Sequence, residues 1–315
     1  MDGGLVGLFA IALVVGAPAS LAGFGKFTEA VTPGIAAQAS DKMLSLKSPA
    51  IPAAVLSSPP KVSAEALIAV SSRPSSSAVA QAATVRDPAL PVIAICIDDL
   101  GSDPASTLKA MALPKNVTLA FLPFADATPR LAVKAEEEGH EVLAHVPMEA
   151  IGATNPGPMT LKVGAPDIAE KLAWSLARVP GLSGINYHEG SRFSTDPESL
   201  MPVAETLAAR HLFFFDSRTI AGSQIVPVAH RYGVESAGRD VFLDNVTSDD
   251  AIKAQLALLA AKARKTGIAI AIGHPHGITL RMLAAWLAQD RGLNLVPVSE
   301  AIRLRTERNA LLAAE

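Results

Sequence analysis

The stretch Pro91-Val-Ile-Ala-Ile-Cys-Ile-Asp-Asp-Leu-Gly101 decides the fold of this chain. Its first part is apolar and rich in β-branched residues, and it ends in two adjacent carboxylates followed by Leu-Gly. This pattern predicts a buried parallel strand that runs into a turn. Two neighbouring carboxylates repel each other, so keeping both charged beside an apolar strand requires a nearby cation or a shared proton. Asp98 and Asp99 therefore indicate a functional site, although one Asp capping the next helix and one facing water would give the same sequence.

The composition of the chain bears on its partners. Hydrophobic residues make up 50% of the 315 residues, charged residues make up 18%, and the net charge is only -3. This balance does not favour a nucleic-acid surface, so no nucleic-acid partner is expected. The single cysteine, Cys96, lies inside the first predicted strand. It cannot form an intramolecular disulfide, and we expect it to be a core residue.

The N-terminal segment predicts a membrane association. Residues 3–25 carry no charge and are strongly apolar in the middle, and about 20 such residues can span a bilayer. A cleaved signal peptide is the alternative for residues 1–25, but no basic residue precedes the apolar run. We favour an uncleaved anchor. Residues 26–88 are rich in Ala, Pro and Ser and predict a disordered linker. We therefore expect a domain in the cell envelope, periplasmic or extracytoplasmic, anchored to the inner membrane.

From residue 89 to residue 305, strand-like and helix-like stretches alternate. The strands are predicted over residues 92–97, 116–123, 141–148, 184–190, 211–216, 241–244, 267–277 and 293–298. The helices are predicted over residues 106–112, 128–139, 165–179, 225–232, 249–265 and 278–289, with another beginning at residue 196 and a helical tail over residues 306–315. This order predicts an α/β fold with a mostly parallel sheet, and seven or eight such units point to a closed or nearly closed barrel.

Titratable residues gather at the carboxyl ends of the predicted strands. They are Asp98, Asp99, His145, Glu149, His188, Asp216, Asp244, His274 and His276. The carboxyl ends of parallel strands meet at one rim, so these residues should converge although they are distant in sequence. Four of the seven histidines lie there, which chance explains poorly. His140, His211 and His230 lie in or beside helices and are expected to be structural.

An Asp and two imidazoles from different strands form the ligand set of a catalytic divalent-metal site. A second carboxylate can take a proton from water, while a histidine on the opposite side protonates the leaving group. The rim thus contains the parts needed to hydrolyse an amide or ester. Plainer interpretations exist: His145 could bond to backbone in the core, His188 could be a loop residue, and Asp216 and Asp244 could cap turns.

Six segments together resemble the divergent polysaccharide deacetylases, in order, over residues 91–302. They are Ile95-Cys-Ile-Asp-Asp-Leu-Gly101, Gly139-His-Glu-Val-Leu-Ala-His-Val-Pro-Met-Glu149, Gly184-Ile-Asn-Tyr-His-Glu-Gly-Ser191, Phe214-Phe-Asp-Ser-Arg-Thr219, Val241-Phe-Leu-Asp-Asn245 and Ala269-Ile-Ala-Ile-Gly-His-Pro-His276. The resemblance implies a distorted (β/α) barrel of about seven strands. It also implies removal of N-acetyl groups from amino-sugar polymers with a divalent metal, usually zinc.

The resemblance also implies roles for individual residues. Asp98 matches the general base, Asp99 and His145 match metal ligands, and His274 matches the general acid. Where the family has its second metal histidine, this chain has Glu149. The third ligand is therefore Glu149 or another residue, and we favour His188 because the divergent group carries a histidine there. Substrate contacts are expected from four further rim residues: Glu149, Asp216, Asp244 and His276.

These observations lead to one expected function and one alternative. The expected function is a metal-dependent hydrolase that removes N-acetyl groups from an envelope glycan such as peptidoglycan. The alternative is an inactive glycan- or metal-binding protein on the same fold. The presence of both Asp98 and His274 favours the enzyme, because metal binding alone needs neither a base nor an acid. The Arg-x-Pro-Tyr/Trp segment that shapes the usual groove is missing, which favours the binding protein.

Overall fold

The computed structural model describes residues 87–152 and 154–314. The predicted anchor over residues 1–25 and nearly all of the predicted linker over residues 26–88 lie outside this range. Within it, no helix is both long enough and apolar enough to cross a membrane.

Within residues 87–152 and 154–314, nine strands form one sheet. They are β1 (Val92–Leu100), β2 (Thr118–Phe121), β3 (Val142–Met148), β4 (Gly184–Glu189), β5 (Phe213–Asp216), β6 (Ser236–Gly238), β7 (Val241–Phe242), β8 (Ile268–Gly273) and β9 (Asn294–Leu295). Their order is β6-β5-β4-β3-β2-β1-β8-β7, and β9 pairs with β1. The strand pairings are parallel.

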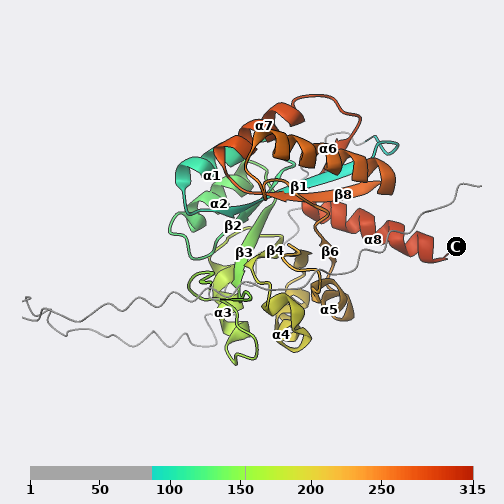
Figure 1. Cartoon of the computed structure of the whole chain (residues 1–315). Helices are drawn as coiled ribbons and strands as arrows, with labels where there is room; N and C mark the ends of the chain where they lie inside the picture. Colours follow the sequence, from blue (N-terminus) through green and yellow to red (C-terminus); the bar gives the residue numbers. More distant parts are fainter. Residues whose placement is uncertain (1–86, 153, 315) are drawn as a thin grey trace, which may run out of the picture. The chain divides into compact units, whose positions relative to one another are not determined.

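Helices connect the strands and lie around the sheet (Figure 1). They are α1 (Pro104–Met111), α2 (Thr128–Glu137), α3 (Ile168–Ala177), α4 (Pro197–Ala209), α5 (Ile225–Arg231), α6 (Asp249–Thr266), α7 (Gly277–Leu287) and α8 (Val298–Ala314), with a short 3₁₀ turn over Phe193–Thr195. The sheet curls into a half-barrel whose two ends are β6 and β7. This architecture confirms the predicted distorted (β/α) barrel.

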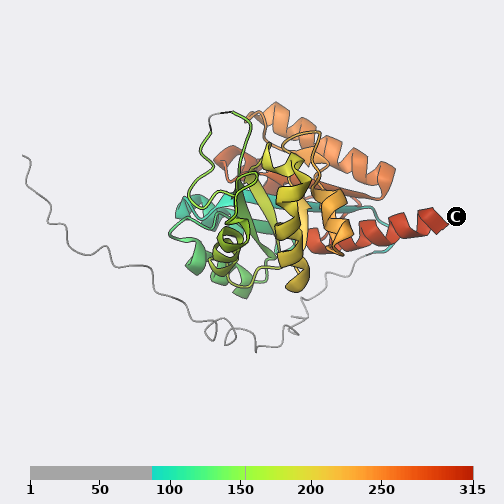
Figure 2. The ribbon, with the colours of Figure 1, turned by 90° about the horizontal axis from the view of Figure 1, so that it is seen from below.

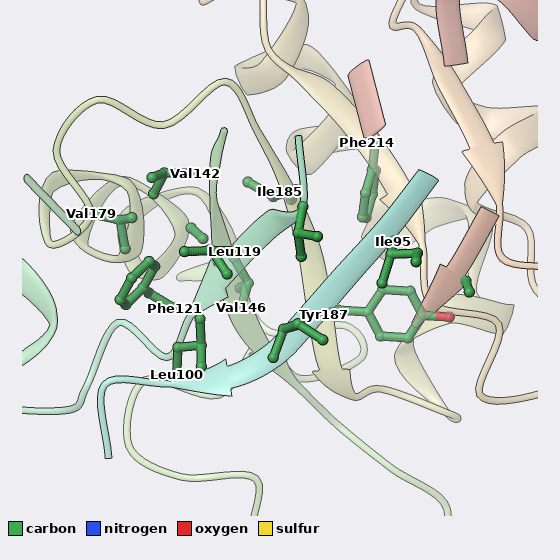
Figure 3. Packing of buried hydrophobic residues seen from close by; sticks show 14 of the residues in the cluster. Ile95, Leu100, Leu119, Phe121, Val142, Val146, Val179, Ile185, Tyr187 and Phe214 are labelled. Atoms are coloured by element: carbon green, nitrogen blue, oxygen red, sulfur yellow. The ribbon is translucent and has the colours of Figure 1, made fainter. Parts of the chain in front are cut away.

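The pleat of β1 separates two hydrophobic cores. Ile93, Ile95 and Ile97 pack with residues of the surrounding helices, and Figure 3 shows Ile95 in this core with Ile185, Tyr187 and Phe214. The alternate residues Val92, Ala94 and Cys96 face the concave side of the sheet and pack in the second core. Because side chains alternate along a strand, one apolar run supplies both cores. Cys96 is fully buried, as predicted.

Helix α8 fills the concave side of the curled sheet. Its residues Val298, Ala301 and Ile302 belong to the second core, and the helix packs against β1, β8 and β6. It then extends from the domain, with the C terminus at its end (Figure 2). The helix begins at Val298, so the tail predicted over residues 306–315 is the end of a longer helix. The last predicted strand is correspondingly shorter.

A buried carboxylate holds the first turn of α8. The backbone N–H of Ser299 donates to both oxygens of Glu141, at 3.1 and 3.3 Å, and Thr118 donates its hydroxyl to the same carboxylate at 2.9 Å. Helix N-termini leave backbone N–H groups unpaired, and an anionic acceptor satisfies them. These bonds explain how Glu141, which lies one residue before β3, can be only 6% exposed.

Candidate metal centre

Three candidate residues continue the concave rows of the strands. Cys96, Leu143 and Ile272 belong to the second core. Two positions after them, in the same order, come Asp98 on β1, His145 on β3 and His274 just beyond the end of β8. Residues two apart share one face of a strand. The alternation that builds the apolar interior therefore also delivers these three polar side chains to its carboxyl rim.

Asp99 reaches the rim through an irregularity in β1. The register between β1 and β2 shifts between Ile97 and Leu100, and Asp99 has a positive φ of 59°. On a regular strand, adjacent residues point to opposite faces, so Asp98 and Asp99 could not serve one site. The left-handed backbone costs about 1–3 kcal/mol for a residue with a Cβ, and such conformations gather at functional sites. Asp103, not Asp98 or Asp99, caps α1.

Asp99, His145 and His188 form the candidate metal site. Oδ1 of Asp99 lies 2.9 Å from Nδ1 of His188 and 3.3 Å from Nε2 of His145. One ligand atom from each of the three residues lies within 4.8 Å of the other two. Atoms bound tetrahedrally to one zinc ion at about 2.1 Å would lie roughly 3.4 Å apart. The spacing of this cluster is therefore close to that of a zinc ligand set.

The hydrogen bonding of Asp99 also fits a cation. Its Oδ1 is buried and has no hydrogen-bond partner among the described residues, despite the two nearby ring nitrogens. The nitrogens are close enough, but their N–H directions do not meet this oxygen. Burial opposes ionisation of Asp99, but the two histidines hold its pKa well below the ordinary value. A charged, buried oxygen without a hydrogen bond is a suitable ligand for a divalent metal.

Asn186 orients His145, and the sequence analysis did not identify it. The amide nitrogen of Asn186 donates to Oδ1 of Asp98 at 2.8 Å, which leaves the amide oxygen facing Nδ1 of His145, also at 2.8 Å. Nδ1 must therefore donate, and in the neutral ring the lone pair lies on Nε2, facing Asp99. The signal was available, because Asn186 lies two residues before His188 on the same face of β4.

The surroundings of His145 favour its protonated form when no metal is bound. Burial lowers its pKa, but the nearby carboxylates of Asp98 and Asp99 and the hydrogen bond to Asn186 outweigh burial and raise the pKa to about 9. A proton and a metal ion would compete for the same ring nitrogen.

His274 lies on another side of the cluster and is held by Asp244. Its Nδ1 lies 2.9 Å from Oδ1 of Asp244. The other carboxylate oxygen, Oδ2, accepts the backbone N–H of His274 and the hydroxyl of Thr279. Nε2 of His274 faces the cluster, 4.0 Å from Oδ2 of Asp99. Burial lowers the pKa of His274, but Asp244 and the other carboxylates raise it above the ordinary value. Asp244 therefore positions His274.

The other predicted substrate-contact residues lie at or just beyond the carboxyl ends of their strands. Glu149, the alternative third ligand, accepts the backbone N–H of Val163 at 2.8 Å and pairs with Arg192 at 3.1 Å. Asp216 is 2% exposed, and its Oδ1 accepts the hydroxyl of Tyr187 and a backbone N–H. His276 is exposed at the start of α7. Their substrate contacts stay predictions, but the structure brings His188, rather than Glu149, to Asp99 and His145.

The histidines expected to be structural lie away from the cluster. His140 is 2% exposed and its two ring nitrogens lie 2.9 and 3.0 Å from the carbonyls of Val117 and Met111. Burial lowers its pKa. His211 and His230 are exposed. The three residues Phe213, Phe214 and Phe215 are all buried, so they offer no platform for a sugar.

Comparison with known proteins identifies the family. Residues 95–302 match the model of the divergent polysaccharide deacetylases. The chain belongs to this family. Its fold is therefore that of a carbohydrate deacetylase-like domain.

The chain is similar to several proteins that are named only as uncharacterized. It is 34% identical over 193 residues to the uncharacterized protein YibQ of Escherichia coli K12, covering 61% of this chain and 60% of that protein. It is 32% identical over 197 residues to an uncharacterized protein of Haemophilus influenzae, covering 62% and 70%. A crystal structure of an uncharacterized protein from Agrobacterium tumefaciens C58 has 31% identity and a TM-score of 0.65, and covers 67% of this chain and 89% of that one.

The raised pKa of His145 predicts how metal binding depends on pH. The metal-free site carries a proton on His145 below about pH 9, and a metal bound through Nε2 must displace it. Zinc affinity should therefore rise about tenfold per pH unit between pH 7 and pH 9, with about one proton released per zinc bound.

Competition with a chromophoric chelator measures the affinity, and calorimetry in buffers of different ionisation enthalpy counts the protons. His230→Ala, which changes an exposed histidine outside the cluster, should show the same pH dependence as the unchanged chain. A zinc affinity that is flat over this pH range would contradict the assignment of His145 as a ligand.

Proposed function

We propose that this chain is a metal-dependent hydrolase that removes N-acetyl groups from an envelope glycan such as peptidoglycan. The observation that carries the proposal is the position of His274. Asp244 holds its Nδ1, and its Nε2 points toward Asp99 without being one of the three clustered ligand atoms. A site that only bound a metal would need no such additional imidazole. Family membership supports the acetylated glycan as substrate.

Zinc is the proposed metal, because two imidazoles and one carboxylate are a donor set that catalytic zinc sites use. When bound, the metal would polarise the acetyl carbonyl and make water more acidic. The protein itself has to supply a group that accepts the proton of the attacking water and a group that protonates the leaving amine.

Asp98 is suited to accept the proton of water. It is 2% exposed, and its Oδ1 already accepts hydrogen bonds from Asn186 at 2.8 Å and from the Cys96 thiol at 3.2 Å. Its Oδ2 makes no hydrogen bond with the described residues and lies 3.8 Å from Nδ1 of His145. One oxygen therefore fixes the carboxylate, and the other is available for a proton. Burial excludes competing solvent and keeps the orientation of the carboxylate constant.

His274 is suited to donate a proton on the other side. With Nδ1 donating to Asp244, a protonated ring presents the N–H of Nε2 to the rim. Asp244 also accepts from the hydroxyl of Thr279, so both the carboxylate and the imidazole have fixed orientations. A positioned acid paired with a positioned base typically contributes about 10²–10⁴-fold each to a rate.

Two substitutions test this proposal. Asp98→Asn and His274→Ala should each keep the fold and the bound zinc, but should lower acetate release from N-acetylated glycan fragments by about 10²-fold or more. The two losses should not add in the double variant, because both groups act in one transition state. The measurement is acetate released by the zinc-loaded chain from peptidoglycan and chitin fragments, with His230→Ala as the control.

The outcome also distinguishes the enzyme from the inactive binding protein. If the unchanged, zinc-loaded chain binds the fragments but releases no acetate, the binding protein is the correct description. In that case Asp98 would serve to orient His145 through Asn186.

We also propose that the domain works outside the cytoplasm, because the charge-free segment over residues 3–25 is long enough for an anchor. A fusion of residues 1–88 to a phosphatase that is active only in the periplasm should give activity in the membrane fraction. An inactive fusion of normal abundance would exclude this location.

A further inference from the structure

A cavity lies at the carboxyl rim, beside the metal centre. Its volume is about 750 Å³, within the usual range for small-molecule sites. It is lined by residues that follow β5 and β6 and by the start of α5: Asp216, Arg218, Ile220, Ala221, Ser223, Val226, Pro227 and Arg239. We term it the arginine pocket.

The backbone around Arg218 is held in an unusual conformation. Arg218 has a positive φ of 48°. Its N–H donates to Oδ1 of Asp216 at 2.8 Å, and its carbonyl accepts from Nη2 of Arg239 at 2.8 Å. Arg239 also donates from Nε to the carbonyl of Ser217 at 2.7 Å. The turn that carries Arg218 is therefore fixed on both sides, as expected for a residue whose direction matters.

The side chain of Arg218 lies against Gly238. A Cβ added to Gly238 would lie only 2.1 Å from Nε of Arg218 and 2.6 Å from its Cζ. The strand β6 thus ends in a residue without a side chain where the guanidinium passes. Arg218 makes its hydrogen bonds through its backbone, and its side chain has no hydrogen bond or ion pair with the described residues.

The charges in the pocket do not balance. Arg239 donates from Nε and Nη2 to backbone carbonyls, and its Nη1 has no partner among the described residues. The carboxylate of Asp216 lines the same cavity, but it is 2% exposed and its Oδ1 accepts from Tyr187 and from the backbone of Arg218. Burial lowers the pKa of Arg239, the charges of Asp98 and Asp216 oppose this effect, and the like charge of Arg218 adds to it. Two guanidiniums thus line the cavity together with one carboxylate, whose Oδ1 already accepts two hydrogen bonds.

The arginine pocket is linked to the metal centre by packed rings. The guanidinium of Arg239 lies 4.7 Å from the centre of the Phe242 ring, and the Phe242 ring lies 5.2 Å from that of His274. A glycan that places one acetamide at His274 would therefore extend over neighbouring residues of this rim.

We propose that the arginine pocket binds an oxyanion substituent of the glycan, a carboxylate or a phosphate, through Arg218 and Arg239. Guanidinium groups bind both kinds of oxyanion with paired hydrogen bonds. The apolar side chains of Ile220, Val226 and Pro227 suit the carbon skeleton that carries the charge. This inference rests on the proposed function and adds to it a substrate class, because it selects acidic glycans over neutral ones.

The test compares the binding of three probes to the full chain. They are a neutral N-acetylglucosamine tetramer, a tetrasaccharide of alternating N-acetylglucosamine and N-acetylmuramic acid, which carries carboxylates, and inorganic phosphate. The carboxylate-bearing tetrasaccharide should bind about tenfold more tightly than the neutral one, and the preference should fall as salt is added.

Two variants assign the preference to the pocket. Arg218→Gln removes the charge, and Gly238→Ala keeps both charges but displaces the guanidinium. Both should abolish the preference while leaving binding of the neutral tetramer unchanged. Arg210→Gln is the matched control, because Arg210 is an exposed arginine at the end of α4, before β5 begins. It should keep the preference.

The possible results separate this inference from the proposed function. Equal binding of both tetrasaccharides, together with phosphate binding that Arg218→Gln abolishes, would identify phosphate as the anion. The inference would be overturned if Arg218→Gln weakened the binding of both tetrasaccharides equally. It would also be overturned if the binding of no probe depended on Arg218. A preference that persists in a chain that releases no acetate would keep the arginine pocket and reject the hydrolase.

Discussion

The site depends on the irregularity at the end of β1. A regular strand would send Asp98 and Asp99 to opposite faces of the sheet, one toward the concave side and one toward the helices. The shift in register and the positive φ of Asp99 bring both carboxylates to one rim. One can then lie among imidazoles while the other remains buried beside them. An isolated buried carboxylate is costly, so the cluster of His145 and His188 around Asp99 is what makes this arrangement favourable.

Neighbouring polar residues fix the orientation of the side chains at the metal centre. Asn186 connects Asp98 to His145 by two hydrogen bonds of 2.8 Å, and Asp244 connects His274 to Thr279. His145 and His274 therefore each present Nε2 to the centre, because Nδ1 donates to a fixed acceptor. The same rim continues to Arg239, which holds the turn of Arg218 through backbone carbonyls. Neighbouring side chains thus position His145, His274 and the turn of Arg218.

Much of this arrangement could be predicted from the sequence, because strand alternation and rim position follow from local patterns. The strands around Ile95, Val146 and Ile270 are apolar runs with clear ends, and the residues after them converge by topology alone. Other features depend on tertiary contacts. The short strand β6 has no apolar run, and α8 begins at Val298 because Thr118 and Glu141 accept its first N–H groups. The roles of Asn186 and Arg218 are likewise set by partners from other strands.

The central claim is that Asp99, His145 and His188 together bind one divalent metal ion. The most direct test is the zinc content of the purified full chain and of two variants. Each is first equilibrated with a small excess of zinc over protein. We predict about one zinc per chain for the unchanged protein and for Glu149→Ala, and a large loss of zinc in His188→Ala, because a site with three protein ligands has none to spare. Unchanged zinc in His188→Ala with loss in Glu149→Ala, or no zinc in the unchanged chain, would contradict the account.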